Sequence, residues 1–248
     1  MLNLTEWLDP HHLIPDGRYF HDLVQSFVRN GYTVNYNLKA ATYDWRYSPS
    51  ELKKSGYFQQ LKNMTEQMVE KFQKKVVYAV HSMGNPVLTY FLTNFEDDLG
   101  IDQHWKDKHI KIWAAISPVF MGSPLSLKSL ISGELEGLPR FLVSALQMRK
   151  LSRTFPSSYF LVPSIPKEYP ESWPDEFKTI VTTDSKNYTF DNMAEIFDDM
   201  QTDGYRNVTD RFLKWRSERQ VVKDPGVPIH IFYGSKVVFL LFASSDYF

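Results

Sequence analysis

A short apolar run that ends in a serine turn most constrains what this chain can fold into. Residues 76–80 are five consecutive apolar residues, mostly β-branched, and His81-Ser82-Met83-Gly84-Asn85-Pro86 follows them directly. Such a run is typical of a strand covered on both faces in a parallel sheet. Helical spacing begins again at Val87, and Pro86 fits if it lies in the first turn of that helix. The pattern predicts a strand, a tight turn and a helix.

The segments around this unit alternate in type. Apolar residues at helical spacing predict helices over residues 19–30 and 57–73, and Gly31 stands where a C-cap belongs. Strands are predicted over residues 32–38, 110–119 and 227–233. This alternation is typical of an α/β fold in which helices flank a mostly parallel sheet.

Residues 120–207 interrupt the alternation. Seven prolines, at positions 124, 139, 156, 163, 166, 170 and 174, lie here among scattered aromatic residues, and one helix is predicted over residues 190–200. We expect a cap-like or lid-like insertion between a core formed by residues 1–119 and a returning core strand within residues 208–234.

Composition excludes several classes of protein. The 248 residues carry 28 basic and 29 acidic side chains, so the net charge of −1 gives no nucleic-acid footprint. Cysteine is absent, which excludes a disulfide scaffold, a cysteine nucleophile and thiolate metal sites. The longest apolar run, residues 237–243, is too short to span a bilayer. We expect neither a metal ion nor a cofactor.

The residue types of the serine turn suit covalent catalysis. A serine between a buried strand and a helix exposes its Oγ above the sheet, and Gly84 avoids a Cβ clash where the chain reverses. The helix N-terminus favours a developing oxyanion, for which the Met83 N–H is the natural donor. The turn thus predicts Ser82 as a nucleophile; the alternative is an ordinary turn serine. Val80 departs from the small residue usual two positions before the serine.

The chain resembles the lecithin:cholesterol acyltransferase family, and its lysosomal phospholipase A2 branch most closely. The resemblance runs in order from about Leu4 to Gly234. Its motifs are Trp7-Leu8-Asp9-Pro10, Tyr43-Asp44-Trp45-Arg46, the serine turn with Asn85, Tyr90-Phe91-Leu92 and Trp105-Lys106-Asp107-Lys108, with less exact matches at residues 117–122 and Tyr233-Gly234. The resemblance implies an α/β-hydrolase that takes an acyl chain from a glycerophospholipid onto Ser82 and passes it to water or a lipid alcohol, at a membrane or lipoprotein surface.

The same resemblance assigns roles to further residues. Asp44, Trp45 and Arg46 match a loop that could line the acyl cleft or orient the serine turn; the alternative is a buried Asp–Arg pair beside a stacked Trp. Four glycosylation sequons begin at Asn3, Asn63, Asn187 and Asn207, and Asn187 matches a family sequon. The family enters the secretory pathway and is lysosomal or extracellular, although no signal peptide is visible in this chain.

The family's catalytic Asp and His follow the Tyr-Gly strand, where this chain does not match. Residues 235–248 contain no histidine and one acid, Asp246, and no other histidine fits a general base. Those considered are His11, His12, His21, His81, His104, His109 and His230, of which His230 is expected in the core. We therefore expect a fragment, truncated at both ends, that is aggregation-prone and without hydrolase activity by itself. The alternative to an enzyme is a catalytically dead remnant or a lipid-surface binding module that uses the aromatic-rich insertion.

Overall fold

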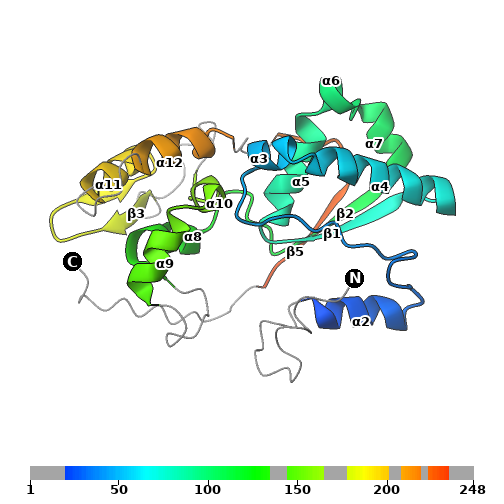
Figure 1. Ribbon diagram of the computed structural model, residues 1–248, viewed down its shortest axis with the longest axis horizontal. Coiled ribbons are helices and arrows are strands. Elements are labelled where there is room, and N and C mark those ends of the chain that lie inside the picture. Colours follow the sequence, from blue (N-terminus) through cyan, green and yellow to red (C-terminus); the bar gives the residue numbers. More distant parts are fainter. Residues whose placement is uncertain (1–19, 135–143, 165–177, 201–207, 219–222, 235–248) are drawn as a thin grey trace. The chain divides into compact units, whose positions relative to one another are not determined.

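The computed structural model describes residues 20–134, 144–164, 178–200, 208–218 and 223–234 (Figure 1). The chain divides into two compact units, residues 1–42 and 43–248, which we describe separately. The tail 235–248 with Asp246, the predicted glycosylation sites at Asn3 and Asn207, and the histidines His11 and His12 lie outside the described residues.

In the first unit, the predicted helix is confirmed and the predicted strand is wrong. Helix α2 spans His21–Arg29, and Gly31 follows it with a φ of 87°. Residues 32–38 form a turn closed by a single bridge between Val34 and Leu38. The Asn37 Oδ1 accepts a 2.6 Å hydrogen bond from the Thr33 N–H. Asparagine side chains that bond the nearby backbone compete with strand pairing, so the alternating pattern did not produce a strand here.

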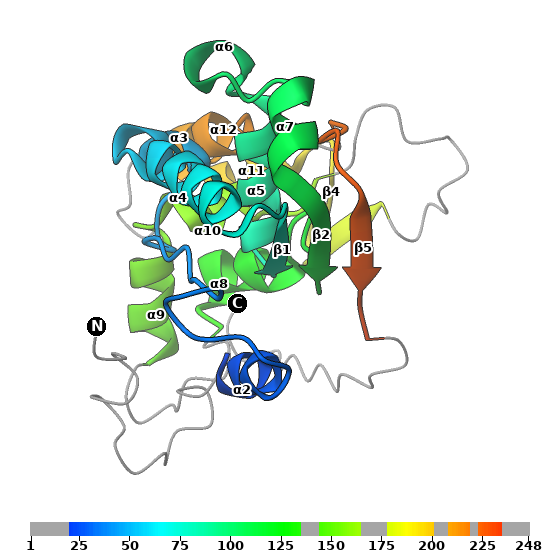
Figure 2. The same ribbon diagram turned by 90° about the vertical axis from the view of Figure 1, so that its right-hand side faces the viewer.

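The second unit contains a parallel sheet. Strands β1 (Val76–His81), β2 (Ile110–Ile116) and β5 (Ile229–Phe232) are paired in the order β1-β2-β5 and point the same way (Figure 2). The three predicted strands are confirmed, but β2 ends earlier than predicted because Ser117 has a φ of 42° and Pro118 follows it. Val77 of β1 is 50% exposed, so the prediction that both faces of this strand are covered is wrong.

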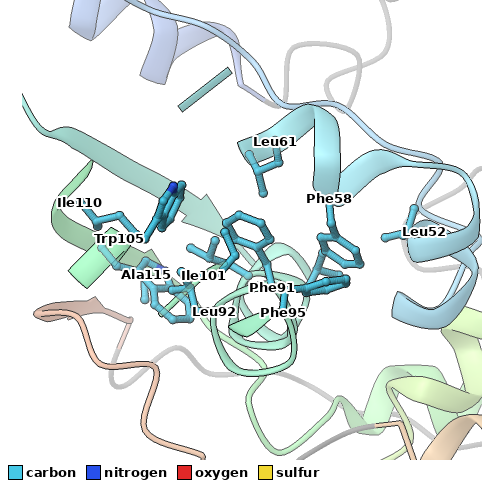
Figure 3. Close-up of a cluster of buried hydrophobic side chains, with 13 residues drawn as sticks. Leu52, Phe58, Leu61, Phe91, Leu92, Phe95, Ile101, Trp105, Ile110 and Ala115 are labelled. Carbon is cyan, nitrogen blue, oxygen red and sulfur yellow. The ribbon is translucent and has the colours of Figure 1, made fainter. Parts of the chain in front are cut away.

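Helices from the first half of this unit build its core, and α4, α5 and α7 among them pack against the sheet. They are α3 (Pro49–Lys54), α4 (Tyr57–Phe72), α5 (Gly84–Thr93), α6 (Glu96–Leu99) and α7 (Gln103–His109). Phe58 of α4 packs against Phe91 and Phe95, with ring centroids 5.9 and 4.9 Å away (Figure 3). Trp113 and Ala115 of β2 belong to the same buried cluster. This core positions α5 against the carboxyl end of β1.

A second hydrophobic cluster forms beyond residue 120. The elements of this region are α8 (Pro124–Ser132), α9 (Ala145–Ser152), α10 (Pro156–Phe160), β3 (Thr179–Thr182), β4 (Asn187–Thr189), α11 (Met193–Asp199) and α12 (Val208–Arg216), and all of them except α9 contribute residues to the cluster. The rings of Phe197 and Phe212 lie 4.6 Å apart at its centre. Helix α11 confirms the predicted helix. Because Val208, Phe212 and Trp215 of α12 belong to this cluster, we propose that the insertion extends through α12 and not only to residue 207.

Candidate active site

The predicted serine turn lies at the carboxyl end of β1. Strand β1 ends at His81, Ser82 has a φ of 49°, and α5 begins at Gly84 with Pro86 in its first turn, so the predicted strand, turn and helix are confirmed. Few non-glycine residues adopt a positive φ, and such a backbone costs on the order of 1–3 kcal/mol. A strained serine in this position is typical of a nucleophile that is held above a sheet.

Gly84 is required by the side chain of Val80. A Cβ at residue 84 would lie 2.8 Å from Val80 Cγ1, closer than two carbon atoms pack, and 3.9 Å from the Tyr43 hydroxyl oxygen. Val80 therefore fits two positions before Ser82, where a small residue is usual, only because residue 84 has no side chain.

Hydrogen bonds join the turn to β2, partly through the side chain of Asn85. The Ser82 N–H donates to the Ile116 carbonyl oxygen at 3.1 Å, and the Asn85 amide group donates to the Ser82 carbonyl oxygen at 2.9 Å. The Asn85 Oδ1 in turn accepts from the Trp113 indole N–H at 3.0 Å. Sequence reasoning did not assign roles to Asn85 or Trp113. The sequence feature that could have indicated a role for Asn85 is its polar side chain among the apolar residues of α5.

The two groups that the sequence predicts for catalysis are not engaged in other hydrogen bonds among the described residues. Ser82 and Met83 are half-buried, and within the described part of the chain neither Ser82 Oγ nor the Met83 N–H makes a hydrogen bond. The Met83 N–H lies at the N-terminal end of α5, where the helix dipole favours negative charge. The arrangement can therefore present a hydroxyl beside an unoccupied backbone donor.

None of the described histidines is hydrogen-bonded to Ser82 Oγ. His81 adjoins Ser82, and burial lowers the pKa of its imidazole below the usual value. His109 is buried, with Nδ1 bonded to the Trp105 carbonyl oxygen at 2.7 Å. His230 is exposed on β5, so the expectation that it lies in the core is wrong. Ile231 and Phe232 of the same strand are also 54% exposed, so the described structure leaves most of β5 uncovered.

The Asp44–Arg46 pair forms, but it is not buried. Arg46 Nε donates to Asp44 Oδ1 at 2.8 Å, although the Arg46 side chain is 52% exposed, and its hydrogen bonds lower the pKa of the Asp44 carboxyl. Trp45 is 59% exposed and meets Phe155 edge to face, with ring centroids 5.2 Å apart. The alternative of a buried Asp–Arg pair beside a stacked Trp is therefore right about the pair and wrong about its burial and about the stacking. A bidentate pair can form in partial contact with water, so its pattern did not require burial.

The loop that carries this pair still reaches the serine turn, through Tyr43. The Tyr43 hydroxyl oxygen lies 3.9 Å from the place of a Cβ at residue 84, and burial raises the pKa of Tyr43 to about 12. At the other end of the loop, the Arg46 carbonyl oxygen accepts from the Ser157 N–H at 3.1 Å. The loop thus connects the serine turn to α10 of the second cluster. Tyr43 is a residue that sequence reasoning quoted in its motif but did not assign to the site.

An apolar cavity of about 220 Å³ lies along α5. Its wall includes Pro86, Tyr90, Trp113, Phe160 and Ile231. Its two charged wall residues are engaged elsewhere: Glu218 accepts from the Ser50 N–H and hydroxyl, and Lys223 donates to the Thr93 carbonyl oxygen. The cavity therefore offers an apolar ligand a largely apolar surface.

Two of the four predicted sequons can be placed. Asn187 is exposed on β4. Asn63 is exposed in the middle of α4, whereas Thr65 of the same sequon is buried and bonds the Leu61 carbonyl oxygen at 2.8 Å. Asn187 therefore has the more accessible surroundings for a glycan.

Other kinds of site have no support among the described residues. They contain no group of three or more histidine or acidic side chains that could hold a metal ion. None of their helices has both the length and the apolar character needed to cross a bilayer. The described aromatic residues between 120 and 200 are buried or half-buried, so they do not form an exposed lipid-binding surface.

Comparison with known proteins adds a family to this geometry. The model of the family described as lecithin:cholesterol acyltransferase matches residues 2–235. The chain is similar to phosphatidylcholine-sterol acyltransferase of Gallus gallus, with 33% identity over 93% of this chain and 51% of that protein. It is also similar to lysosomal phospholipase A and acyltransferase of Bos taurus (32% identity) and of Homo sapiens (33% identity), in each case over 94% of this chain and 52% of the relative. The chain spans about half the length of these curated relatives.

Proposed function

The chain belongs to the lecithin:cholesterol acyltransferase family, and on this premise we propose that it carries the nucleophile of a lipid acyltransferase or phospholipase. In this proposal Ser82 Oγ attacks the acyl carbon of an ester in a glycerophospholipid. A bond forms between Ser82 Oγ and the acyl carbon, and the bond between the acyl carbon and the glycerol oxygen breaks. The glycerol oxygen leaves with the proton of the Ser82 hydroxyl. Water or a lipid alcohol then takes the acyl group from Ser82, and its proton restores the Ser82 hydroxyl. The parallel sheet and serine turn belong, in the same proposal, to an α/β-hydrolase fold.

One observation carries the proposal: Ser82 combines a left-handed backbone at a strand end with the N-terminus of α5. The Met83 N–H is the proposed oxyanion donor, because it has no hydrogen-bond partner in the described part of the chain and lies beside Ser82. The cavity along α5 is proposed to take part of the acyl chain, since Pro86 and Trp113 bring its wall next to the turn. The proposal assigns no general base.

Selective modification of Ser82 tests this proposal in the 248-residue chain. A long-chain alkyl fluorophosphonate forms a covalent bond to an activated serine, and mass spectrometry locates it. Oxyanion donors and substrate binding alone retain about 10³–10⁴-fold of the rate advantage in a serine enzyme without a complete triad. We therefore expect slow labelling that is selective for Ser82 and absent in Ser82→Ala.

Ser117 is a matched internal control, because it too has a positive φ at the end of a parallel strand but no helix begins beside it. Equal labelling of Ser82 and Ser117 would refute the proposed nucleophile. Binding to phosphatidylcholine vesicles without selective labelling would instead support the non-catalytic alternative, a lipid-surface binding module.

A further inference from the structure

The Asn85 side chain is buried at the junction of β1, β2 and α5. Its residue is 0% exposed, and so is Trp113. A primary amide offers two donor hydrogens and an acceptor oxygen, and all three directions are used. Nδ2 donates to the Ser82 carbonyl oxygen at 2.9 Å and toward the Ile116 carbonyl oxygen at 3.5 Å, while Oδ1 accepts from Trp113 Nε1 at 3.0 Å.

These carbonyl groups are the ones that shape the serine turn. The Ile116 carbonyl oxygen also accepts the Ser82 N–H at 3.1 Å, and the Ser82 carbonyl oxygen also accepts the Asn85 N–H at 3.1 Å. The Asn85 side chain therefore bonds both acceptors through which the backbone of Ser82 is held. A left-handed serine persists only where surrounding contacts over-determine its conformation.

We propose that Asn85 and Trp113 are positioning residues that hold the backbone of Ser82 in its left-handed conformation, and with it the directions of the Ser82 hydroxyl and the Met83 N–H. Trp113 orients the Asn85 amide group by donating a hydrogen bond to its oxygen. The amide hydrogens then point to the carbonyl oxygens of Ser82 and Ile116. The effect of these residues on the reactivity of Ser82 rests on the proposed function, whereas their effect on the backbone conformation of Ser82 does not.

The chain contains a matched pair that separates positioning from packing. Trp105 is also buried in the same cluster, and its indole N–H donates to Glu66 Oε1 at 2.8 Å. Trp113→Phe and Trp105→Phe therefore each remove one indole hydrogen bond of a buried tryptophan in the same core. Only the first bond reaches Ser82 through Asn85.

Amide hydrogen exchange at the serine turn is the first measurement. We expect Trp113→Phe to speed exchange of the Ser82 amide by about 5-fold to 10-fold relative to exchange in the rest of the core, as the loss of one hydrogen bond predicts. Trp105→Phe is expected to leave this ratio unchanged. Equal acceleration of the turn in both variants would show that Trp113 acts by packing and would overturn the proposal.

Asn85→Asp supplies a pH signature that packing does not. A protonated carboxyl has the shape of the amide and can donate to the Ser82 carbonyl oxygen, whereas an ionised carboxylate cannot. Burial raises the pKa of such a carboxyl, so the switch is expected above the usual range of aspartate. Protection of the Ser82 amide should be near that of the unsubstituted chain at low pH and be lost as the carboxyl ionises.

Labelling of Ser82 by the alkyl fluorophosphonate is the second measurement. We expect its rate to fall with the protection of the turn, by about 10-fold to 100-fold for a small displacement of a nucleophile. Protection of the Ser82 amide that does not change with pH in Asn85→Asp would overturn the positioning role. If exchange behaves as expected but Ser82 is labelled in no form of the chain, the positioning role stands and the proposed function fails.

Discussion

The substitution Gly84→Ala is expected to destabilise the chain through a single contact. The added Cβ would lie 2.8 Å from Val80 Cγ1, so one of the two groups must move. Val80 cannot turn away easily, because its side chain branches at Cβ and lies in β1. Overpacking of this kind costs about 1–3 kcal/mol, and we expect the free energy of unfolding to fall by that amount.

The methyl groups of Val80 provide the control for this prediction. In a Val80→Ala background the nearest atom to the new Cβ is removed, and alanine has a helix propensity about 1 kcal/mol better than glycine. Gly84→Ala should therefore become neutral or stabilising there, which gives a coupling free energy of about 1 kcal/mol or more between the two positions. Urea unfolding followed by circular dichroism measures all four proteins. An identical cost of Gly84→Ala in both backgrounds would show that the steric reasoning is wrong.

Two further predictions concern the surroundings of the turn. Burial lowers the pKa of His81, so below its ordinary value of about 6.5 the unfolded chain binds more protons than the folded chain, and stability is lost as the pH falls through that value. His81→Gln should make this loss shallower in denaturation curves between about pH 7 and pH 5, and parallel pH profiles would contradict the reasoning. Ile231→Trp should fill part of the cavity and slow labelling of Ser82 by a long-chain fluorophosphonate more than by a short-chain one. Leu213→Trp, at a similarly exposed position outside the cavity, should leave that ratio unchanged, and an unchanged ratio in Ile231→Trp would exclude the cavity as the acyl site.

The residues of the segment itself were enough to predict the serine turn and the strand and helix on either side of it. An unbroken apolar run followed by Ser82, Gly84 and Pro86 specifies strand, turn and helix within about fifteen residues, because each choice restricts the backbone directly. The parallel sheet followed from the same reasoning, since alternating strands and helices leave few arrangements that bury the apolar side of each element. Ser82 and Met83 could be proposed as functional residues on these grounds alone.

Contacts between distant residues were decided only by the tertiary structure. The hydrogen bond between Asn85 and Trp113 joins residues on different elements, and nothing in either local pattern predicts it. Asp44 and Arg46 paired as expected, yet their exposure depends on what covers the loop, and spacing carries no information about that. Residues 32–38 alternate like a strand, but a strand needs a pairing partner, and here the Asn37 side chain accepts the Thr33 N–H within the segment instead. Sequence specifies what a segment can form, whereas burial and long-range partners determine which of those forms persists.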